Sequence, residues 1–225
     1  MKDILNGKKA IIFDLDGTLL NTLEDLMDSV NYGLKAHHMP ERSLEEIRCF
    51  VGNGVERLIE LAVPEGTGDL EREKVFAQFK AHYKIHCNDK TGLYPGVEEL
   101  LARLKEEGFA MAIVSNKLQE GVDALNKQYF DRYVETAIGA REGIRKKPAP
   151  DTVMEALRIL DLPKERVVYV GDSEVDIATA QNAGMDCINV AWGFRTRKEQ
   201  EKAGAKVFVE RPEEIVELLY HDMGD

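Results

Sequence analysis

The sequence predicts an α/β fold in which a parallel sheet, covered by helices on both faces, is interrupted by a helical insertion. Short continuous apolar runs alternate with segments whose apolar residues recur every three or four positions. This alternation is typical of buried parallel strands joined by helices. By contrast, the stretch from residue 21 to about residue 90 shows only the helical period.

The apolar runs mark the expected strands. The first, Lys9–Phe13, ends abruptly in polar residues, as a buried strand does where it meets a turn. Further strands are expected at Phe109–Val114, Val167–Val170 and Cys187–Ala191, with weaker ones near Tyr133–Ile138 and at Lys206–Val209. Helices are expected around residues 97–104 and 153–160, where apolar residues are spaced i, i+3, i+4, i+7.

The helical stretch is too long for one crossover connection between strands, so we expect a separate small bundle inserted into the α/β domain. One apolar stripe runs from Leu23 to Leu34, a second from Val55 to Ala62, and a third helix is expected between Leu70 and Ile85. The resulting division assigns residues 1–20 and 93–225 to the α/β core and residues 21–92 to the helical cap.

Composition and charge exclude several functions. The chain has a formal net charge of −11, and no segment gathers enough Lys and Arg for nucleic-acid or anionic-membrane binding. The longest apolar run is far shorter than the roughly 20 residues of a membrane-spanning helix. The N-terminus lacks a signal-peptide core, and the cysteines are few and widely spaced. We expect a cytoplasmic protein with no nucleic-acid or membrane partner, while nothing in the sequence indicates its oligomeric state.

Polar residues follow four of the expected strands, where open parallel sheets bind their ligands. Asp14 and Asp16 are two residues apart on extended chain, so their carboxylates point to the same side, and Gly17 allows the turn that exposes them. The other three groups are Ser115-Asn116, Lys147-Pro148-Ala149-Pro150 and the segment from Gly171 to Asp176.

These groups together suit phosphoryl transfer. Asp172 joins Asp14 and Asp16 to give a set of carboxylates whose mutual repulsion requires a bound cation. An all-oxygen set without His or Cys favours Mg²⁺, which commonly also contacts a substrate phosphate. Ser115 and Lys147 are then expected to hold the phosphate oxygens, one through its hydroxyl and the other through its charge.

Each group taken alone has an ordinary structural explanation. An isolated Asp-x-Asp is usually a solvated turn, a Ser at this place usually caps a helix, and a lone Lys is usually a surface charge. A calcium loop is excluded because its glycine would stand at the sixth position and a Glu at the twelfth. Four coincidences at four strand ends are much less probable than one site.

The same residues resemble a known family. Phe13 to Leu19, Val114-Ser115-Asn116, Lys147 to Pro150 and Gly171 to Asp176 are similar, in this order, to the four motifs of the haloacid dehalogenase-like hydrolases. The resemblance implies a Rossmann-like core with a mobile helical cap between the first and second motifs. It also implies Mg²⁺ bound by Asp14, Asp172 and the backbone carbonyl of Asp16. True dehalogenases lack the second Asp and need no metal, so Asp16 argues against dehalogenation.

Within this superfamily the chain is most similar to the phosphoglycolate phosphatases. The similarity lies in Phe50–Gly54, Leu93–Val97 and Ala191–Phe194. It implies a Mg²⁺-dependent phosphatase for a small phosphorylated metabolite, with 2-phosphoglycolate as the expected substrate. A phosphosugar mutase or a pyrophosphatase on the same core remains an alternative, and so does a non-catalytic phosphate-binding protein, although the latter would be expected to have lost Asp14 or Asp16.

The roles expected on this basis can be assigned by residue. We expect Asp14 to be the nucleophile and Asp16 the general acid and base. Asp176 is expected to orient Lys147 or the waters of the metal. The residues expected to bind phosphate are Thr18, Ser115, Asn116 and Lys147.

Two features of the insertion were weighed separately. Gly52-Asn53-Gly54 lacks the third glycine and the preceding strand of a dinucleotide-binding loop, so we expect it to open a helix whose free N–H groups meet an anionic substrate group. Arg57, one turn later, is as compatible with added substrate affinity as with a surface role. His82 and His86 have zinc-compatible spacing but no nearby third ligand, so packing or surface roles are expected.

Overall fold

The structure, a computed structural model, describes residues 4–220, and the chain divides into two compact units. One unit comprises the residues up to Leu19 and from Leu93 onward, and the other comprises Leu20–Gly92. The sequence places these divisions after residues 20 and 92. We call the first the α/β unit and the second the helical unit.

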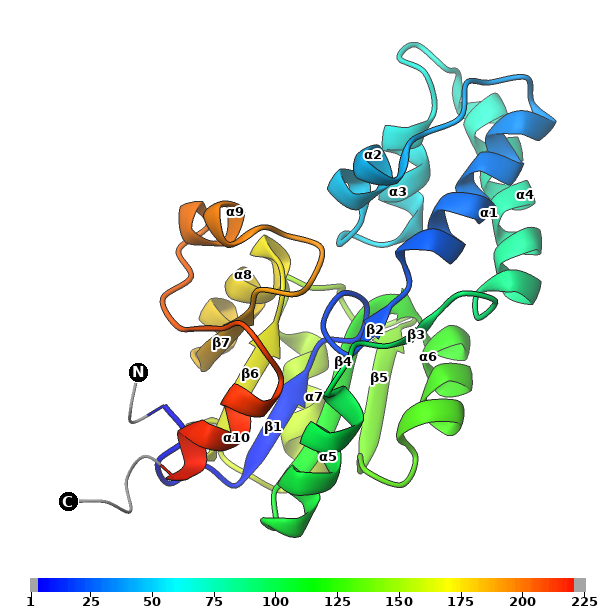
Figure 1. Cartoon of the computed structure of the whole chain (residues 1–225). Helices are drawn as coiled ribbons and strands as arrows, with labels where there is room; N and C mark the ends of the chain where they lie inside the picture. Colours follow the sequence, from blue (N-terminus) through cyan, green and yellow to red (C-terminus); the bar gives the residue numbers. More distant parts are fainter. Residues whose placement is uncertain (1–3, 221–225) are drawn as a thin grey trace. The chain divides into compact units, whose positions relative to one another are not determined.

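A six-stranded parallel sheet forms the centre of the α/β unit (Figure 1). Its strand order is β5-β4-β1-β6-β7-β8, so the N-terminal strand lies in the middle. Ala10 of β1 pairs with Ala110 on one side and with Val167 on the other. The strands are β1 (Ala10–Phe13), β4 (Ala110–Leu118), β5 (Thr136–Ala140), β6 (Val167–Gly171), β7 (Asp186–Val190) and β8 (Phe208–Val209). The predicted fold class, an α/β protein with a Rossmann-like parallel sheet, is confirmed.

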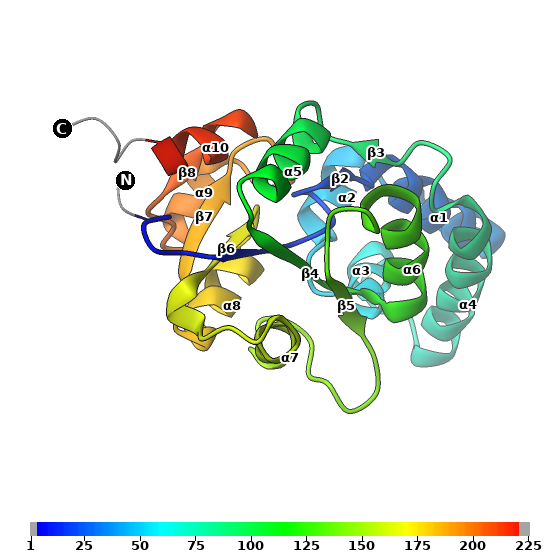
Figure 2. The same cartoon turned by 90° about the horizontal axis from the view of Figure 1, so that it is seen from below.

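Helices cover both faces of this sheet, which is why its strands are apolar on both sides. Helices α7 (Asp151–Leu160) and α8 (Glu174–Ala183) lie on one face, and α5 (Val97–Glu106) and α10 (Glu213–Tyr220) on the other (Figure 2). Ala10 and Ile12 belong to a buried cluster with residues of α7 and α8, whereas Ile11 and Phe13 alternate with them. The remaining elements of this unit are α6 (Gln119–Leu125), a π-helical turn (Asn126–Phe130), a 3₁₀ turn (Lys164–Arg166) and α9 (Arg197–Lys202).

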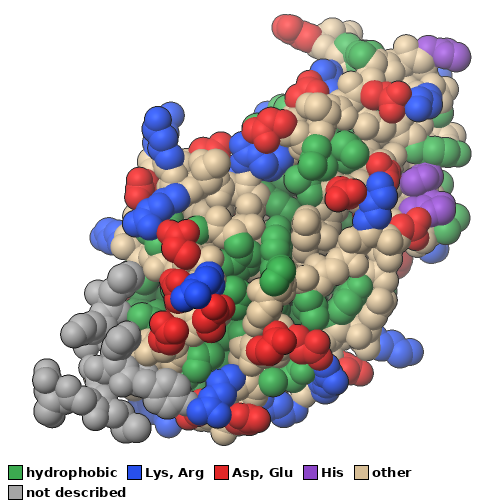
Figure 3. All heavy atoms as spheres, in the orientation of Figure 1, with side chains coloured by type: hydrophobic (Ala, Val, Ile, Leu, Met, Phe, Trp, Pro, Cys, Tyr) green, Lys and Arg blue, Asp and Glu red, His purple; other side chains and the backbone are tan. Residues whose placement is uncertain are grey.

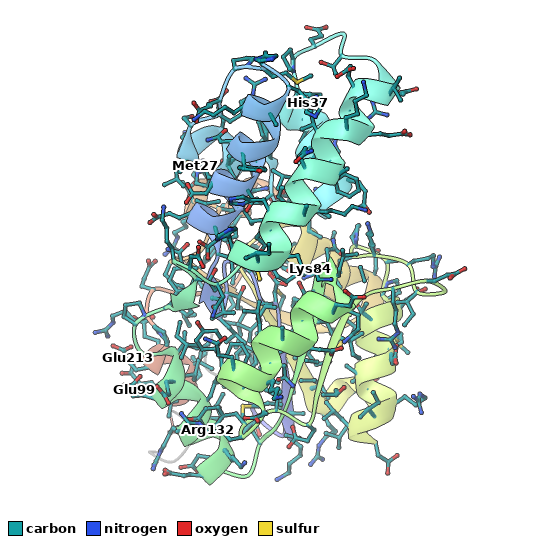
Figure 4. All side chains as sticks on the ribbon, turned by 90° about the vertical axis from the view of Figure 1, so that its right-hand side faces the viewer. Met27, His37, Lys84, Glu99, Arg132 and Glu213 are labelled. Carbon is teal, nitrogen blue, oxygen red and sulfur yellow. The ribbon has the colours of Figure 1, made fainter. Side chains whose placement is uncertain are left out.

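The helical unit contains α1 (Leu23–Ala36), α2 (Leu44–Phe50), α3 (Val55–Ala62) and α4 (Asp69–His86). Helices α1 and α4 pack side by side (Figure 4, where Met27 lies on α1). At Gly33 the two helices lie so close together that an added Cβ would be 2.9 Å from the carbonyl oxygen of Val75. Val30 and Leu34 of α1 and Phe79 of α4 are buried between them, so the predicted apolar stripe of α1 faces this packing.

Three short elements, one helix and two strands, are not predicted by the sequence. Helix α2 is too brief to show an apolar stripe, but Ser43 and Glu46 form a capping box at its start. Strands β2 (Leu20–Asn21) and β3 (Gly92–Leu93) pair as a two-stranded sheet where the chain leaves and re-enters the α/β unit. In the helical unit the buried carboxylate of Asp25 accepts hydrogen bonds from the N–H groups of Lys90 and Thr91. These bonds fix the C-terminal end of the unit to α1.

The surface agrees with the scattered charges of the sequence. On the described part of the face drawn in Figure 3, Lys and Arg side chains are interspersed with Asp and Glu. Within residues 4–220 no helix combines the length and apolarity needed to cross a bilayer. Cys49, Cys87 and Cys187 are not joined in disulfides.

Candidate active site

The site begins at the end of the central strand. The backbone N–H of Asp14 donates to the carbonyl of Val170 (2.9 Å), which continues the pairing of β1 with β6 and fixes the direction of the residue. Asp14 is 7% exposed, and its Oδ1 accepts a hydrogen bond of 2.6 Å from Nζ of Lys147. The first and third predicted motifs therefore meet through a buried ion pair.

Lys147 is held from several directions. Its Nζ also donates to Oδ1 of Asp176 (2.9 Å) and to the hydroxyl oxygen of Tyr169 (3.1 Å). The side-chain amide of Asn116 accepts from the backbone N–H of Lys147 (2.8 Å) and donates to its carbonyl (3.0 Å). The loop that carries Lys147 is thus tied to β4, and its ammonium group is aimed at the end of β1.

Asp172 lies at the end of β6 among closely packed backbone. Its Oδ2 accepts the N–H of Phe194 at 2.6 Å, and its Oδ1 lies 3.4 Å from the Thr18 hydroxyl. A Cβ on Gly193 would lie 2.3 Å from Cβ of Asp172, and a Cβ on Gly17 would lie 2.5 Å from its Oδ2. Only glycine fits at these two positions, so the loops after β1 and β7 close tightly around the carboxylate.

Asp176, in the first turn of α8, has both carboxylate oxygens engaged. Oδ1 accepts from Lys147 and from the Tyr169 hydroxyl (2.8 Å), while Oδ2 accepts the N–H and hydroxyl of Ser173 (3.1 and 2.6 Å). A Cβ on Gly171 would lie 2.4 Å from Cγ of Asp176, so glycine is also required there.

The cluster carries more negative charge than its lysine neutralises. Burial, followed by the charge of Asp176, raises the pKa of Asp14 well above its usual range although Lys147 opposes the change. Burial and then Asp176 also raise the pKa of Asp172 to about 7. Burial opposes ionisation of Asp176 too, but Lys147 and the hydrogen bonds from Ser173 and Tyr169 keep its pKa below the usual value. Asp14 and Asp176 raise the pKa of Lys147 despite its burial, so it stays charged.

The excess of negative charge in this cluster is relevant to the predicted Mg²⁺ site. Carboxylate oxygens of Asp14, Asp172 and Asp176 lie within 4.8 Å of one another. Buried carboxylates at this spacing need a cation or protons. Each oxygen of Asp176 already accepts two hydrogen bonds, whereas each oxygen of Asp172 has one such contact within the described residues, so Asp14 and Asp172 are the better donors. An all-oxygen donor set of this kind fits Mg²⁺.

Asp16 is more accessible than Asp14 and faces β4. Nζ of Lys117 lies 3.1 Å from its Oδ1, and the Ser115 hydroxyl lies 3.5 Å from its Oδ2. Of the described contacts, those of the Asp16 carboxylate thus go to β4, whereas the Asp14 carboxylate contacts Lys147.

The predicted residues of the insertion lie in the helical unit. Gly52 and Gly54 have φ values of +119° and +86°, and Gly54 caps the start of α3, as expected for a loop that opens a helix. Asn53 lies between them, and Arg57 forms an exposed ion pair with Glu60 (2.7 Å). The histidines have structural contacts: Nδ1 of His82 lies 3.0 Å from Oγ of Ser29, and Nδ1 of His86 lies 2.8 Å from Oδ2 of Asp89.

Sequence reasoning missed three contributors to the site. Tyr169 reads as one more apolar residue of a buried strand, and Phe194 contributes only its backbone N–H. Lys117 immediately follows a predicted motif, and this position in the sequence was the available signal. Asn116 was expected to bind phosphate, but its side-chain amide instead holds the Lys147 backbone.

Comparison with known proteins assigns the class of this fold and site. Residues 11–190 match the model of the haloacid dehalogenase-like hydrolase family, and the chain belongs to that family. It is 34% identical over 199 residues to a phosphoglycolate phosphatase of Mesorhizobium japonicum (strain LMG 29417 / CECT 9101 / MAFF 303099), covering 87% of this chain and 88% of the relative.

Two further comparisons give the same result. A phosphoglycolate phosphatase of Rhodobacter capsulatus is 35% identical, with 83% of this chain and 85% of the relative covered. A solved structure from Lactobacillus delbrueckii subsp. bulgaricus, provisionally assigned to phosphoglycolate phosphatase, is 37% identical with a TM-score of 0.89. It covers 93% of this chain and 97% of that chain. These matches confirm the predicted enzyme class, a phosphoric monoester hydrolase similar to the phosphoglycolate phosphatases.

Proposed function

We propose that this chain is a Mg²⁺-dependent phosphatase that hydrolyses a small phosphomonoester, 2-phosphoglycolate in the first instance, through an aspartyl-phosphate on Asp14. The observation that carries the proposal is the ion pair between Asp14 and Lys147 at the end of the central strand, beside the buried Asp172. It places a carboxylate nucleophile next to a fixed positive charge, as phosphoryl transfer requires.

The metal would be held by the carboxylates of Asp14 and Asp172 and, as the family resemblance implies, by the backbone carbonyl of Asp16. When bound, Mg²⁺ supplies positive charge that offsets the repulsion among these carboxylates and neutralises charge on the transferring phosphoryl group. Asp176 remains outside this set because its two oxygens hold Lys147, Tyr169 and Ser173.

The residues of the chain then divide the reaction between them. Asp14 attacks phosphorus in line with the leaving oxygen, and Asp16 gives its proton to the departing alkoxide. In the second half Asp16 removes a proton from the water that hydrolyses the aspartyl-phosphate, so the acid is regenerated. Lys147 and the Ser115 hydroxyl stabilise the phosphoryl oxygens, with the Thr18 segment beside them, while Asn116, Tyr169 and Asp176 position Lys147.

The substrate is proposed from the relatives. The two named above are phosphoglycolate phosphatases and are matched over most of their length. Phosphoglycolate places a carboxylate a short distance from its phosphate, and this second anion needs its own donors. We assign that task to the backbone N–H groups at the start of α3, where the loop Gly52-Asn53-Gly54 opens the helix.

Phosphate release from a substrate panel tests the function. The panel contains 2-phosphoglycolate, hexose phosphates, pyrophosphate and p-nitrophenyl phosphate, each supplied with Mg²⁺. We expect phosphoglycolate to give the highest kcat/KM. Faster release from pyrophosphate would assign a pyrophosphatase, and rearrangement of a sugar 1-phosphate without free phosphate would assign a mutase.

Metal exchange tests the proposed cofactor. Chelation should stop turnover, and added Mg²⁺ should restore it. Ca²⁺ should inhibit, because it accepts more numerous and less regular oxygen ligands and can engage both oxygens of Asp14. Equal rates with Ca²⁺ and Mg²⁺ would contradict this assignment.

A further inference from the structure

Lys117 is a buried lysine that the reaction outlined above does not use. Its side chain is 6% exposed, and its Nζ lies 3.1 Å from Oδ1 of Asp16, whose side chain is 20% exposed. A lysine this buried has lost most of the water around its ammonium group, so it requires compensating partners. The ion pair therefore fixes both groups more firmly than a surface pair would.

Strand β4 delivers Lys117 to this position. Alternate residues of a strand point to the same side, and the contacts of Ser115 and Lys117 both reach Asp16 while the intervening Asn116 holds the Lys147 loop. The backbone N–H of Lys117 donates to the Ser115 hydroxyl at 3.1 Å. The Asp16 carboxylate thus contacts the Ser115 hydroxyl through one oxygen and the Lys117 ammonium group through the other, and both residues belong to β4.

The aliphatic stem of Lys117 runs beside α6. A Cβ added to Gly121, in α6, would lie 3.5 Å from three successive methylene carbons of this stem. The first turn of α6 therefore lies along one side of the stem, with room for one more carbon between them.

We propose that Lys117 is a positioning residue that holds the Asp16 carboxylate in the orientation required for proton transfer to the leaving oxygen and from the attacking water. The inference rests on the proposed function, because that function gives Asp16 its role. Lys117 forms no bond to the substrate and exchanges no proton with it. Its effect is to keep one carboxylate rotamer in place through both half-reactions.

The leaving group separates this role from a structural one. Phosphoglycolate releases an alkoxide that needs a proton, whereas p-nitrophenyl phosphate releases a stable phenolate that does not. We expect Lys117→Met to lower kcat for phosphoglycolate about tenfold or more and to leave the rapid burst of p-nitrophenol within a few-fold of wild type. Lys117→Arg, which retains the charge, should recover part of the loss.

A double-mutant cycle and a matched control complete the test. In an Asp16→Asn background, Lys117→Met should cause little further loss, because the group it positions is already gone. The control is Lys8→Met, which removes another buried lysine of the same unit, paired with Asp186 at 2.8 Å and 8% exposed. Its kinetics should remain those of wild type, and thermal unfolding of each variant shows whether the fold is kept.

Different results would overturn either the role of Lys117 or the proposed function itself. Unchanged phosphoglycolate kinetics in Lys117→Met, or losses that multiply with those of Asp16→Asn, would overturn the positioning role. Equal losses on both substrates with a raised KM would assign Lys117 to phosphate binding instead. Wild-type protein inactive on every phosphomonoester would overturn the proposed function, and with it the role of Asp16 on which this inference depends.

Discussion

Among the individual residues, Asp172 shows how burial changes the pKa of a carboxylate in this site. Its pKa is raised from 3.8 to about 7, first by burial and then by the charge of Asp176. In the metal-free protein the folded state therefore keeps a proton that the unfolded chain has lost. The stability gained from this proton is fully present below about pH 4 and disappears as the pH rises through about 7.

This linkage gives a measurable pH dependence. In the presence of EDTA, wild-type protein should lose thermal stability between pH 5 and pH 8, and Asp172→Asn should lose less, because an amide has no charge to bury. At pH 8 the free energies of unfolding of wild type and Asp172→Asn should differ by about a few kcal/mol at most. Unfolding curves of the two proteins that shift in parallel with pH would show that Asp172 does not titrate in this range.

Asp14 leads to a prediction about chemistry without loss of fold. Asp14→Asn should lower turnover by at least about a thousandfold, because an amide of nearly the same shape is a poor nucleophile. Lys147 keeps its contact with Asp176, so the melting temperature in EDTA should change little. Phosphate release and thermal unfolding measure the two effects. Substantial residual activity would remove Asp14 from the nucleophile role.

The individual residues differed in how well the sequence could reveal them. Asp14, Asp16, Lys147 and Asp172 were predictable because each follows a buried strand, and parallel strands bring their carboxyl ends to one edge. The role of Tyr169 was not predictable from the sequence. The apolar pattern indicates that its side chain is buried, but it does not indicate which groups its hydroxyl contacts. For the same reason the sequence could not show that the side-chain amide of Asn116 holds the Lys147 backbone.

At the scale of elements, the crossing of α1 and α4 depends on one glycine. An alanine at position 33 would place its Cβ 2.9 Å from the carbonyl oxygen of Val75 and 3.3 Å from the N atom of Phe79. Both are backbone atoms of α4, so one helix must move. Gly33→Ala should therefore destabilise the protein by about 1–3 kcal/mol, although alanine favours a helix over glycine by about 1 kcal/mol.

Gly121 provides the matched control for this prediction. It also lies within a helix, but the three atoms nearest to its added Cβ would be side-chain carbons of Lys117 at an ordinary 3.5 Å. Gly121→Ala should leave stability unchanged or raise it by up to about 1 kcal/mol. Urea unfolding of both variants gives the comparison. Effects of the same sign and size would show that packing at the crossing does not decide the outcome.

The elements that the sequence predicted best were the long periodic ones. β4 was expected to stop at Val114 because polar residues follow, yet it continues to Leu118 with Ser115, Asn116 and Lys117 inside the strand. Because the polar residues of the site lie inside β4, the apolar pattern ended before the strand did. Helix α2 has seven residues, too few to reveal a period, although its Ser-x-x-Glu capping box was readable.

At the scale of the whole molecule, the two units are expected to divide chemistry and selectivity. Gly54 has φ of +86°, a conformation that a β-branched residue tolerates poorly. Gly54→Val should impair phosphoglycolate turnover far more than that of p-nitrophenyl phosphate, which lacks the second anion. The steady-state kcat/KM on the two substrates is the measurement.

Gly66 controls for backbone strain in that experiment. Its φ of +82° is nearly the same, and open space surrounds it. Gly66→Val should therefore reproduce any loss of stability without the change in selectivity. Equal loss of both activities in Gly54→Val would place selectivity elsewhere, and unchanged kinetics would show that the loop does not reach the substrate.

The central position of β1 also constrains how the chain is made. Residues of β1 are synthesised first, but the strands on either side of it arrive only with Ala110 and Val167. The helices of residues 20–92, whose contacts are nearer in sequence, can pack on the ribosome while Ile11, Ile12 and Phe13 still await partners. Pairing across such separations is slow, and an apolar strand left open is prone to aggregate. A nascent chain that stops short of Val167 therefore carries Asp14, the proposed nucleophile, at the end of a strand that still lacks one of its two neighbours.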